Sequence, residues 1–196
     1  MKTKSEGVFE SFLTLNNLAF KKIKEDTSSR PDYLVRIGNC EVIFEVKELA
    51  GDEKCGVVGV VASATLGEHV RRTIHGSRKQ IQFGADQGIP SILLVYNSMD
   101  SYQMFGTADL DFTSAMYGEY TVLIGQDTTS ELFNGRNQSL QENKNTSFSA
   151  VGRLADRFGR PTVTLFENPF SKVKVPYDQL PPCFQIDRAV VSITTT

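Results

Sequence analysis

The chain has 196 residues and a net charge of −2, and its hydrophobic and charged contents of 40% and 22% are ordinary for a globular protein. That length suits one domain with a sizeable core. No apolar run approaches the roughly 20 residues of a membrane span, and residues 1–6 lack the apolar core of a signal peptide. We therefore expect a cytoplasmic protein without a membrane partner. The weak net acidity excludes a global attraction to nucleic acid, which would need a local basic patch.

The first predicted element is an amphipathic helix over residues 5–18, with Ser5 as its expected N-cap. Its apolar stripe, at a period of about 3.6 residues, consists of Val8, Phe9, Phe12 and Leu13. Glu6 and Glu10 lie one turn apart and so share a side of this helix. Because acidic residues are common in first turns, the helix alone is the simpler explanation for either glutamate.

After a short strand near residue 20 and a polar loop, residues 30–47 predict two strands joined by a tight turn at Gly38-Asn39. A two-residue loop sets the register, in which Ile37 pairs with Cys40, Val35 with Val42, and Asp32 with Glu45. Side chains alternate along a strand, so one face carries Tyr33, Val35, Ile37, Val42, Phe44 and Val46. The other face carries Asp32, Leu34, Arg36, Glu41, Ile43, Glu45 and Lys47.

The opposed carboxylates of Asp32 and Glu45 are the unusual feature of this hairpin. A solvated polar face explains the alternation of side chains, but two carboxylates directly opposite each other repel. A positive charge between them removes that repulsion. Lys47 shares the face and can contribute, and a divalent cation would do so more strongly, since hard cations take carboxylate oxygens.

The most basic segment is a second predicted helix over residues 68–85. Its apolar stripe consists of Val70, Ile74, Ile81 and Ala85. Its polar side carries Arg71, Arg72, His75, Arg78, Lys79, Gln80 and Gln82. Two interpretations stay open for this side, a solvated helix face and a surface that contacts nucleic-acid phosphates. The preceding glycine-rich segment, residues 49–67, lacks the Gly-Lys-Ser/Thr ending of a phosphate-binding loop.

The remaining elements complete the predicted fold. Residues 91–96 are a continuous apolar run, typical of a strand buried on both faces. A helix is predicted over 107–118, strands over 121–124, 149–154 and 162–166, a loop or exposed hairpin over 125–147, and a mainly irregular tail from Pro169. These elements predict the α/β class, with a mixed central β-sheet flanked by helices. We expect a single domain, with its core in residues 5–125 and a C-terminal β-rich extension of unknown role over 126–196.

The motif in the hairpin reads Pro31-Asp32, twelve residues, then Glu45-Val46-Lys47. It resembles the signature of the PD-(D/E)XK nuclease superfamily, which has the restriction-endonuclease-like fold. The predicted order of helix, three strands, helix and strand also resembles that family's core (αβββαβ). The resemblance covers residues 5–96, and residues 97–196 carry no motif that we can name.

The resemblance implies a role for each matching residue. Asp32 and Glu45 would bind Mg²⁺, or Mn²⁺ in its place, with the backbone carbonyl of Val46 as a further ligand. Lys47 would lie beside the attacking water and the scissile phosphate. Glu6 would match the glutamate of the first helix, directly or through a water, with Glu10 as the competing candidate. The polar residue that many members place on the second helix would be Gln80 or Gln82.

The implied function is a Mg²⁺-dependent phosphodiesterase, expected to be an endonuclease acting on DNA. The residues that would contact nucleic acid are Arg71, Arg72, His75, Arg78, Lys79, Gln80 and Gln82. A homodimer is compatible with this function. The alternative is a catalytically inactive module of the same fold that binds nucleic acid or protein. An unrelated α/β domain with a chance motif is the third interpretation.

Overall fold

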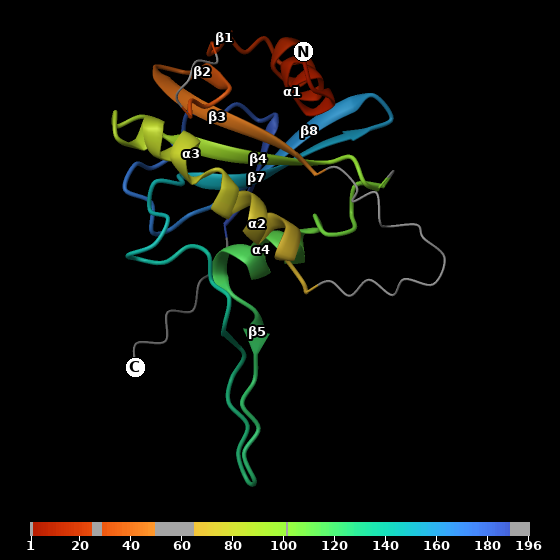
Figure 1. The fold of residues 1–196 in the computed structure, drawn as a ribbon, viewed down its shortest axis with the longest axis vertical. Coiled ribbons are helices and arrows are strands. Elements are labelled where there is room, and N and C mark those ends of the chain that lie inside the picture. The colour runs from red at the N-terminus through yellow and green to blue at the C-terminus, as the bar shows by residue number, and fades with distance from the viewer. Residues whose placement is uncertain (1, 25–28, 50–64, 101, 189–196) are drawn as a thin grey trace.

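A mixed sheet of seven strands runs through the molecule, with helices packed on both of its faces (Figure 1). This computed structural model describes residues 2–24, 29–49, 65–100 and 102–188. The helices are α1 (Lys4–Leu15), α2 (Glu68–Gly76), α3 (Arg78–Ala85) and α4 (Asp109–Tyr117). The strands are β1 (Phe20–Lys22), β2 (Tyr33–Ile37), β3 (Cys40–Leu49), β4 (Ser91–Asn97), β5 (Tyr120–Thr121), β6 (Phe133–Asn134), β7 (Ala150–Arg157), β8 (Arg160–Glu167) and β9 (Phe184–Asp187).

The strand order of the main sheet is β1-β2-β3-β4-β7-β8-β9, so both halves of the chain share one sheet. The predicted α/β class and the mixed sheet flanked by helices are confirmed. The glycine-rich connection predicted over 49–67 lies mostly outside the described residues. Within the part of the chain that the structure describes, no helix is long and apolar enough to cross a membrane.

The predicted hairpin is present in the predicted register. Strands β2 and β3 pair antiparallel, with Ile37 opposite Cys40 and Val35 opposite Val42. Because β2 begins at Tyr33, the regular ladder stops one pair short of Asp32 and Glu45. The site predicted from the motif therefore lies where the two strands stop pairing.

Each face of the sheet covers a hydrophobic core of its own. On one face α1 packs against the apolar side of the hairpin, and the Phe9 ring lies 5.3 Å from Tyr33 and 5.1 Å from Phe44 between centroids. On the other face the core is formed by three helices that contribute Val70, Ile74, Ile81, Phe112, Ala115 and Met116. Strand β4 contributes to both cores and is buried along its whole length, as its apolar sequence predicted.

The start of α1 differs from the prediction. Thr3, and not Ser5, is the N-cap, since the N–H of Glu6 donates to Thr3 Oγ1 at 3.2 Å and the N–H of Thr3 donates to the Glu6 carboxylate at 2.9 Å. This reciprocal capping box satisfies two backbone donors at once. Ser5 lies inside the first turn and is buried.

The single helix predicted over 68–85 is two helices. Ser77 separates α2 from α3, with a φ of −95° and a ψ of 6°. Gly76 before it has a low helix propensity, and serine competes for backbone hydrogen bonds. The predicted apolar stripe is buried at Val70, Ile74 and Ile81, whereas Ala85 is half-buried. The polar residues on the other side therefore do not form one continuous helical surface.

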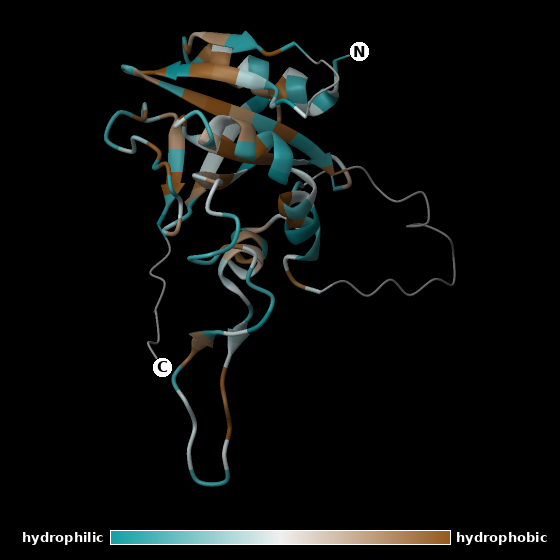
Figure 2. Cartoon of the chain, turned by 60° about the vertical axis from the view of Figure 1, so that its left-hand side comes forward, coloured by the Kyte–Doolittle hydropathy of each residue, from teal (hydrophilic) through white to brown (hydrophobic). Residues whose placement is uncertain are grey.

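The strand predicted over 121–124 is mostly absent. Strands β5 and β6 form a separate two-stranded ladder, and Ile124 makes an isolated bridge with Thr129. The chain between β5 and β6 projects from the body as a long arm (Figure 1) with hydrophobic residues along it (Figure 2). Leu123 and Ile124 are 63% and 82% exposed, and neither belongs to the two cores formed by the described residues. The exposed-hairpin interpretation of the polar region is confirmed here, although the hairpin starts before residue 125.

The strands predicted over 149–154 and 162–166 are confirmed as β7 and β8. They are joined by a tight turn at Phe158-Gly159, whose φ angles are 56° and 75°. The irregular tail adds β9, which pairs parallel with β8. The β-rich C-terminal segment thus extends the same sheet that carries the predicted site.

Candidate functional site

On the side of β3 that faces β2, a side chain replaces the backbone partner once the ladder has ended. The ladder with β2 ends at the pair Tyr33 and Phe44, so the N–H of Val46 lies beyond it. The Oδ2 atom of Asp32 accepts this N–H at 2.8 Å. The backbone carbonyl of Asp32 accepts from the N–H of Ile23 at 2.8 Å. Asp32 is therefore anchored by its main chain and by its carboxylate at the open end of the hairpin.

Glu45 is a buried carboxylate with one unsatisfied oxygen. The residue is 1% exposed, and its Oε1 pairs with Lys47 Nζ at 2.5 Å. Its Oε2 is buried without a hydrogen-bond partner among the described residues. Burial first, and then the charge of Asp32, raise the pKa of Glu45 to about 7 against the opposing effect of Lys47. Such an oxygen needs a proton or a cation.

The carboxyl groups of Asp32 and Glu45 lie within hydrogen-bonding reach of each other. Ionised carboxylates carry no donor, so this contact becomes a hydrogen bond only when one group is protonated. Burial also raises the pKa of Asp32, while the Val46 N–H and Lys47 oppose that shift. Two carboxylates this close do not both ionise at low cost. The pair therefore favours either a shared proton or a bound cation.

Glu6 approaches this corner of the sheet from α1, but a cation engages it. Lys22 of β1 pairs with Glu6 Oε1 at 2.7 Å. Burial would raise the pKa of Glu6, but the hydrogen bonds from Lys22 and Thr3 outweigh it, so the pKa is lowered. The negative charge of Glu6 contributes to the raised pKa of Asp32. Glu6 is thus an electrostatic neighbour of the carboxylate pair.

Glu10, the competitor of Glu6, is engaged elsewhere. Its carboxylate pairs with Lys2 Nζ at 2.5 Å and accepts from the Tyr33 hydroxyl at 2.9 Å.

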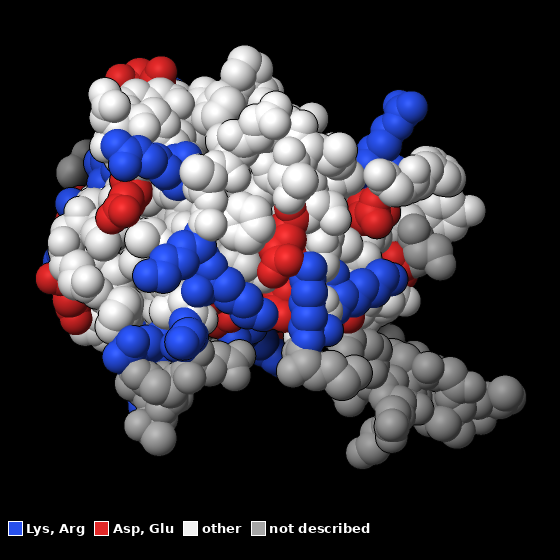
Figure 3. Space-filling view, turned by 90° about the horizontal axis from the view of Figure 1, so that it is seen from above, with Lys and Arg blue, Asp and Glu red and all other residues white. Residues whose placement is uncertain are grey.

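Figure 3 views the molecule from the side of α1 and β1 and shows acidic side chains interleaved with Lys and Arg. Lys22 was missed from the sequence, although its place on a strand beside the motif was a usable signal.

The predicted three-carboxylate set is not assembled as one cluster. No group of three His, Cys, Asp or Glu side chains within the described ranges is arranged to hold a metal ion. Asp32 and Glu45 lie together, and Glu6 lies with Lys22. A pair of carboxylates is nevertheless the usual protein contribution to a Mg²⁺ site, which keeps several waters. The carbonyl of Val46 stays a predicted further ligand.

Helix α3 brings a polar side chain to the level of Glu45. It leads by a short turn into β4, which is parallel to β3, so α3 runs antiparallel to β3. A Cβ on Gly84 would meet the Ile43 side chain at 2.6 Å. One helical turn before Gly84 is Gln80, and two residues after Ile43 is Glu45, so these two lie at a similar height. Gln80 Oε1 is buried without a hydrogen-bond partner in the described part of the chain, whereas Gln82 is exposed.

The other predicted phosphate contacts are spread over α2 and α3. Exposed residues are Arg72, His75 and Lys79. Arg72 pairs with Glu68. Arg71 is half-buried and donates to the backbone carbonyls of Leu66 at 2.5 Å and Ser114 at 3.5 Å. Arg78 is half-buried, and its Nε has no hydrogen-bond partner within the described residues. A phosphate contact by any of them stays a prediction.

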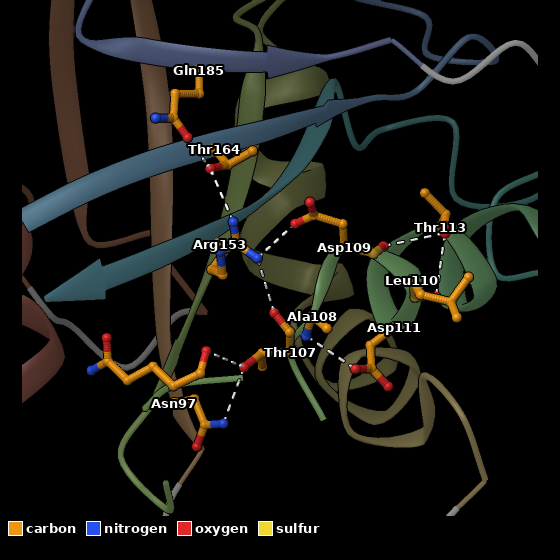
Figure 4. A network of polar contacts seen from close by, with 11 residues as sticks. Asn97, Thr107, Ala108, Asp109, Leu110, Asp111, Thr113, Arg153, Thr164 and Gln185 are labelled. Atoms are coloured by element: carbon orange, nitrogen blue, oxygen red, sulfur yellow. Dashed lines mark hydrogen bonds and ion pairs between the residues drawn. The ribbon is translucent and has the colours of Figure 1, made fainter. Parts of the chain in front are cut away.

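Arg153 of β7 is a charged residue outside the set predicted from the sequence motif. Its Nη1 pairs with Asp109 Oδ1 at 2.6 Å and donates to the carbonyl of Thr107 at 3.4 Å (Figure 4). The strand registers place Arg153 in the same row across the sheet as Lys47, with Val95 between them. An arginine between the apolar residues Val151 and Leu154 of this strand was the signal for a polar environment at this position.

No family model, no curated protein and no solved structure matches this chain. The function must therefore be inferred from the geometry of the site.

Proposed function

We propose that this protein is a metal-dependent nuclease of restriction-endonuclease-like fold that hydrolyses phosphodiester bonds in DNA. One observation carries the proposal: the carboxyl groups of Asp32 and Glu45 meet beside Lys47, and one buried oxygen of Glu45 has no partner among the described residues. The element order supports it, because α1, three strands, a helical segment and β4 follow one another as in the PD-(D/E)XK core. Endonucleolytic cleavage is the expected activity.

Mg²⁺, with Mn²⁺ as a substitute, fits this donor set. Asp32 and Glu45 would hold the ion, with the Val46 carbonyl as a further ligand, because hard cations select oxygen donors. When bound, such an ion lowers the pKa of a water molecule and neutralises charge that develops on the phosphate. Since Lys22 occupies Glu6 Oε1, Glu6 would act through a water or through its charge.

The chain's own residues supply orientation and charge. The hydrogen bond from Val46 holds the Asp32 carboxylate in place. The Lys47 side chain is 39% exposed, so its ammonium group is accessible to a phosphate oxygen once a cation replaces it beside Glu45. A fixed positive charge at that point stabilises the anionic transition state. Gln80 lies at a similar height to Glu45 on the helical side, and its buried Oε1 has no hydrogen-bond partner among the described residues.

The direct test is incubation of the purified protein with supercoiled plasmid and with oligonucleotides, in Mg²⁺, in Mn²⁺ and in a chelator. We expect cleavage only with metal. Asp32→Ala, Glu45→Gln and Lys47→Ala should each lower the rate by about 100-fold or more. Glu41→Gln is the matched control, because Glu41 is an exposed carboxylate on the same strand.

Two results would count against the proposal. Cleavage that continues at the wild-type rate in Asp32→Ala and Lys47→Ala would reject this site. A wild-type protein that binds nucleic acid but neither takes up Mn²⁺ in calorimetry nor cleaves would favour the inactive binding module instead.

A further inference from the structure

The loop between β4 and α4 presents large side chains to solvent. Tyr102, Met104 and Phe105 are 77%, 53% and 67% exposed. Single exposed apolar residues are common, but three within four positions form a patch that calls for a partner. We refer to residues 102–105 as the aromatic loop.

The aromatic loop is held in its conformation by hydrogen bonds. The Asp100 carboxylate accepts from the backbone N–H groups of Tyr102, Met104 and Phe105, each at 2.9 Å. The Asn97 side chain donates to the carbonyl of Phe105 at 2.7 Å. The exposure of both rings is thus built into the backbone, and a ligand would bind without first ordering the loop.

The aromatic loop lies at the C-terminal ends of β3 and β4, the end of the sheet toward which Lys47 lies. The N–H of Ser98 donates to the carbonyl of Leu49 at 3.1 Å, and Leu49 is two residues beyond Lys47 on β3. At the loop's other end, a Cβ on Gly106 would meet the His69 ring of α2 at 2.8 Å. The loop therefore lies between the strand that carries Lys47 and the basic helix α2.

Cationic side chains flank the aromatic loop. Lys47 and Arg153 occupy one row on one face of the sheet with a single strand between them, so their backbones are about 10 Å apart. Arg153 donates to the carbonyl of Thr107, directly after the loop (Figure 4). Arg71 of α2 donates to backbone carbonyls and makes no ion pair with a carboxylate among the described residues.

Three acidic residues near the loop are engaged with partners, whereas the Asp156 backbone N–H donates to Gln103 of the loop and its buried Oδ1 has no hydrogen-bond partner among the described residues. The Asp100 carboxylate accepts three backbone N–H groups, which lower its pKa. Asp109 pairs with Arg153, and Glu68 pairs with Arg72. These contacts reduce the repulsion that a polyanion would otherwise meet at this edge.

We propose that Tyr102 and Phe105 form a stacking platform for unpaired nucleotides, so that the substrate includes a single-stranded segment. This inference rests on the proposed nuclease function and specifies its substrate. Exposed rings stack on the faces of unpaired bases without sequence preference. In a duplex those faces are stacked on each other, so the platform selects single-stranded nucleic acid. Lys47, which a bound cation would release from Glu45, would provide positive charge for the backbone of the same strand.

The sequence contains no tryptophan, so an introduced tryptophan would be the only one and can report on base stacking by its fluorescence. Tyr102→Trp, in a chelator and without divalent metal, should show fluorescence quenching when a short oligothymidylate is added. Blunt duplex of the same length should not quench it. The readout measures stacking directly and does not depend on hydrolysis.

Affinity measurements test the platform without the reporter. Phe105→Ala should weaken binding of the single strand by about tenfold, as expected for loss of one stacked base, with little effect on duplex binding. Asp100→Ala, which keeps both rings but removes the hydrogen bonds that hold them, should weaken the same binding. Tyr120→Ala is the matched control, because Tyr120 is a 52% exposed aromatic residue on the distant arm.

The outcomes separate this inference from the proposed function. Quenching by the single strand, in a protein that shows no metal-dependent cleavage, would support the platform and defeat the nuclease proposal. Metal-dependent cleavage without quenching, and with single-strand affinity equal in wild type, Phe105→Ala and Asp100→Ala, would overturn the platform alone. Equal quenching by duplex and single strand would also overturn it.

Discussion

Asp32 and Glu45 meet at the open end of the hairpin, where Asp32 binds the N–H of Val46 at 2.8 Å and its charge helps raise the pKa of Glu45 to about 7. The two carboxyls therefore have different environments. Asp32 is tied to the backbone, whereas Glu45 is buried with an unsatisfied oxygen. This difference leads to separate predictions for the two residues.

The first prediction concerns stability and pH. The pKa of Glu45 in the folded protein is above its ordinary value of 4.5, so the folded state holds this proton more tightly than the unfolded state. The unfolding free energy should therefore fall as pH rises from about 4.5 to about 7, by as much as roughly 3 kcal/mol. Glu45→Gln should remove this dependence and be the more stable protein at pH 8. Urea unfolding at pH 5 and pH 8 measures this change in unfolding free energy, with Glu41→Gln as the control. Parallel pH profiles for wild type and Glu45→Gln would contradict the prediction.

The second prediction concerns metal binding. A metal ligand must be deprotonated, so Mn²⁺ should raise the melting temperature more at pH 8 than at pH 6, on either side of the pKa of about 7. Thermal unfolding with and without Mn²⁺ tests this. Asp32→Ala should abolish the shift at both values, and a shift of the same size in that variant would argue against the carboxylate pair as the binding site.

The third prediction separates the structural role of Asp32 from its proposed chemical role. Asp32→Asn keeps an oxygen that can accept the Val46 N–H, whereas Asp32→Ala leaves this part-buried donor without its acceptor. Asp32→Ala should therefore cost about 1–3 kcal/mol of stability, and Asp32→Asn less. Both variants should lose cleavage. Chemical unfolding beside the plasmid assay checks both points, and an active Asp32→Asn protein would show that the negative charge is not needed.

The fourth prediction compares two glycines of the helical segment. A Cβ on Gly84 would meet Ser91 Oγ at 2.3 Å and Ile43 Cδ1 at 2.6 Å, whereas a Cβ on Gly76 meets nothing within 4 Å. Gly84→Ala should cost about 1–3 kcal/mol through overpacking between α3 and the sheet. Gly76→Ala should be neutral or stabilise by up to about 1 kcal/mol through helix propensity. The unfolding midpoints of the two variants and of wild type measure these differences in stability. A Gly84→Ala protein as stable as wild type would refute the close packing.

The fifth prediction concerns the start of α1. Thr3→Ala removes the side chain that caps the helix and should cost about 1 kcal/mol. Glu6→Gln can keep its half of the capping box and loses the ion pair with Lys22, so it should cost less. Thermal unfolding of the two variants gives the comparison. Because Lys22 engages Glu6 while Glu45 is the proposed direct ligand, Glu6→Gln should also retain more cleavage activity than Glu45→Gln.

Local patterns in the sequence were sufficient for several elements. The two-residue turn and the alternation of side chains determined the register of Val35 with Val42, because both depend on neighbours along the chain. The apolar run of β4 was recognisable for the same reason. The N-cap of α1 was misplaced, although Thr3 and Glu6 have the spacing of a capping box and so carried a local signal. The break at Ser77 also had a local signal in Gly76, but the apolar stripe continued across it and favoured one helix.

The sequence by itself determined that Asp32 and Glu45 would be neighbours on one face, because strand periodicity and turn length leave little freedom. Only the tertiary structure decided that Glu45 is buried, that Lys22 engages Glu6, and that the aromatic loop reaches the same edge as Lys47. These relationships join residues on separate elements of the fold. They depend on how helices and strands pack, and packing distances are set by the whole sheet and its two cores rather than by any local run of residues.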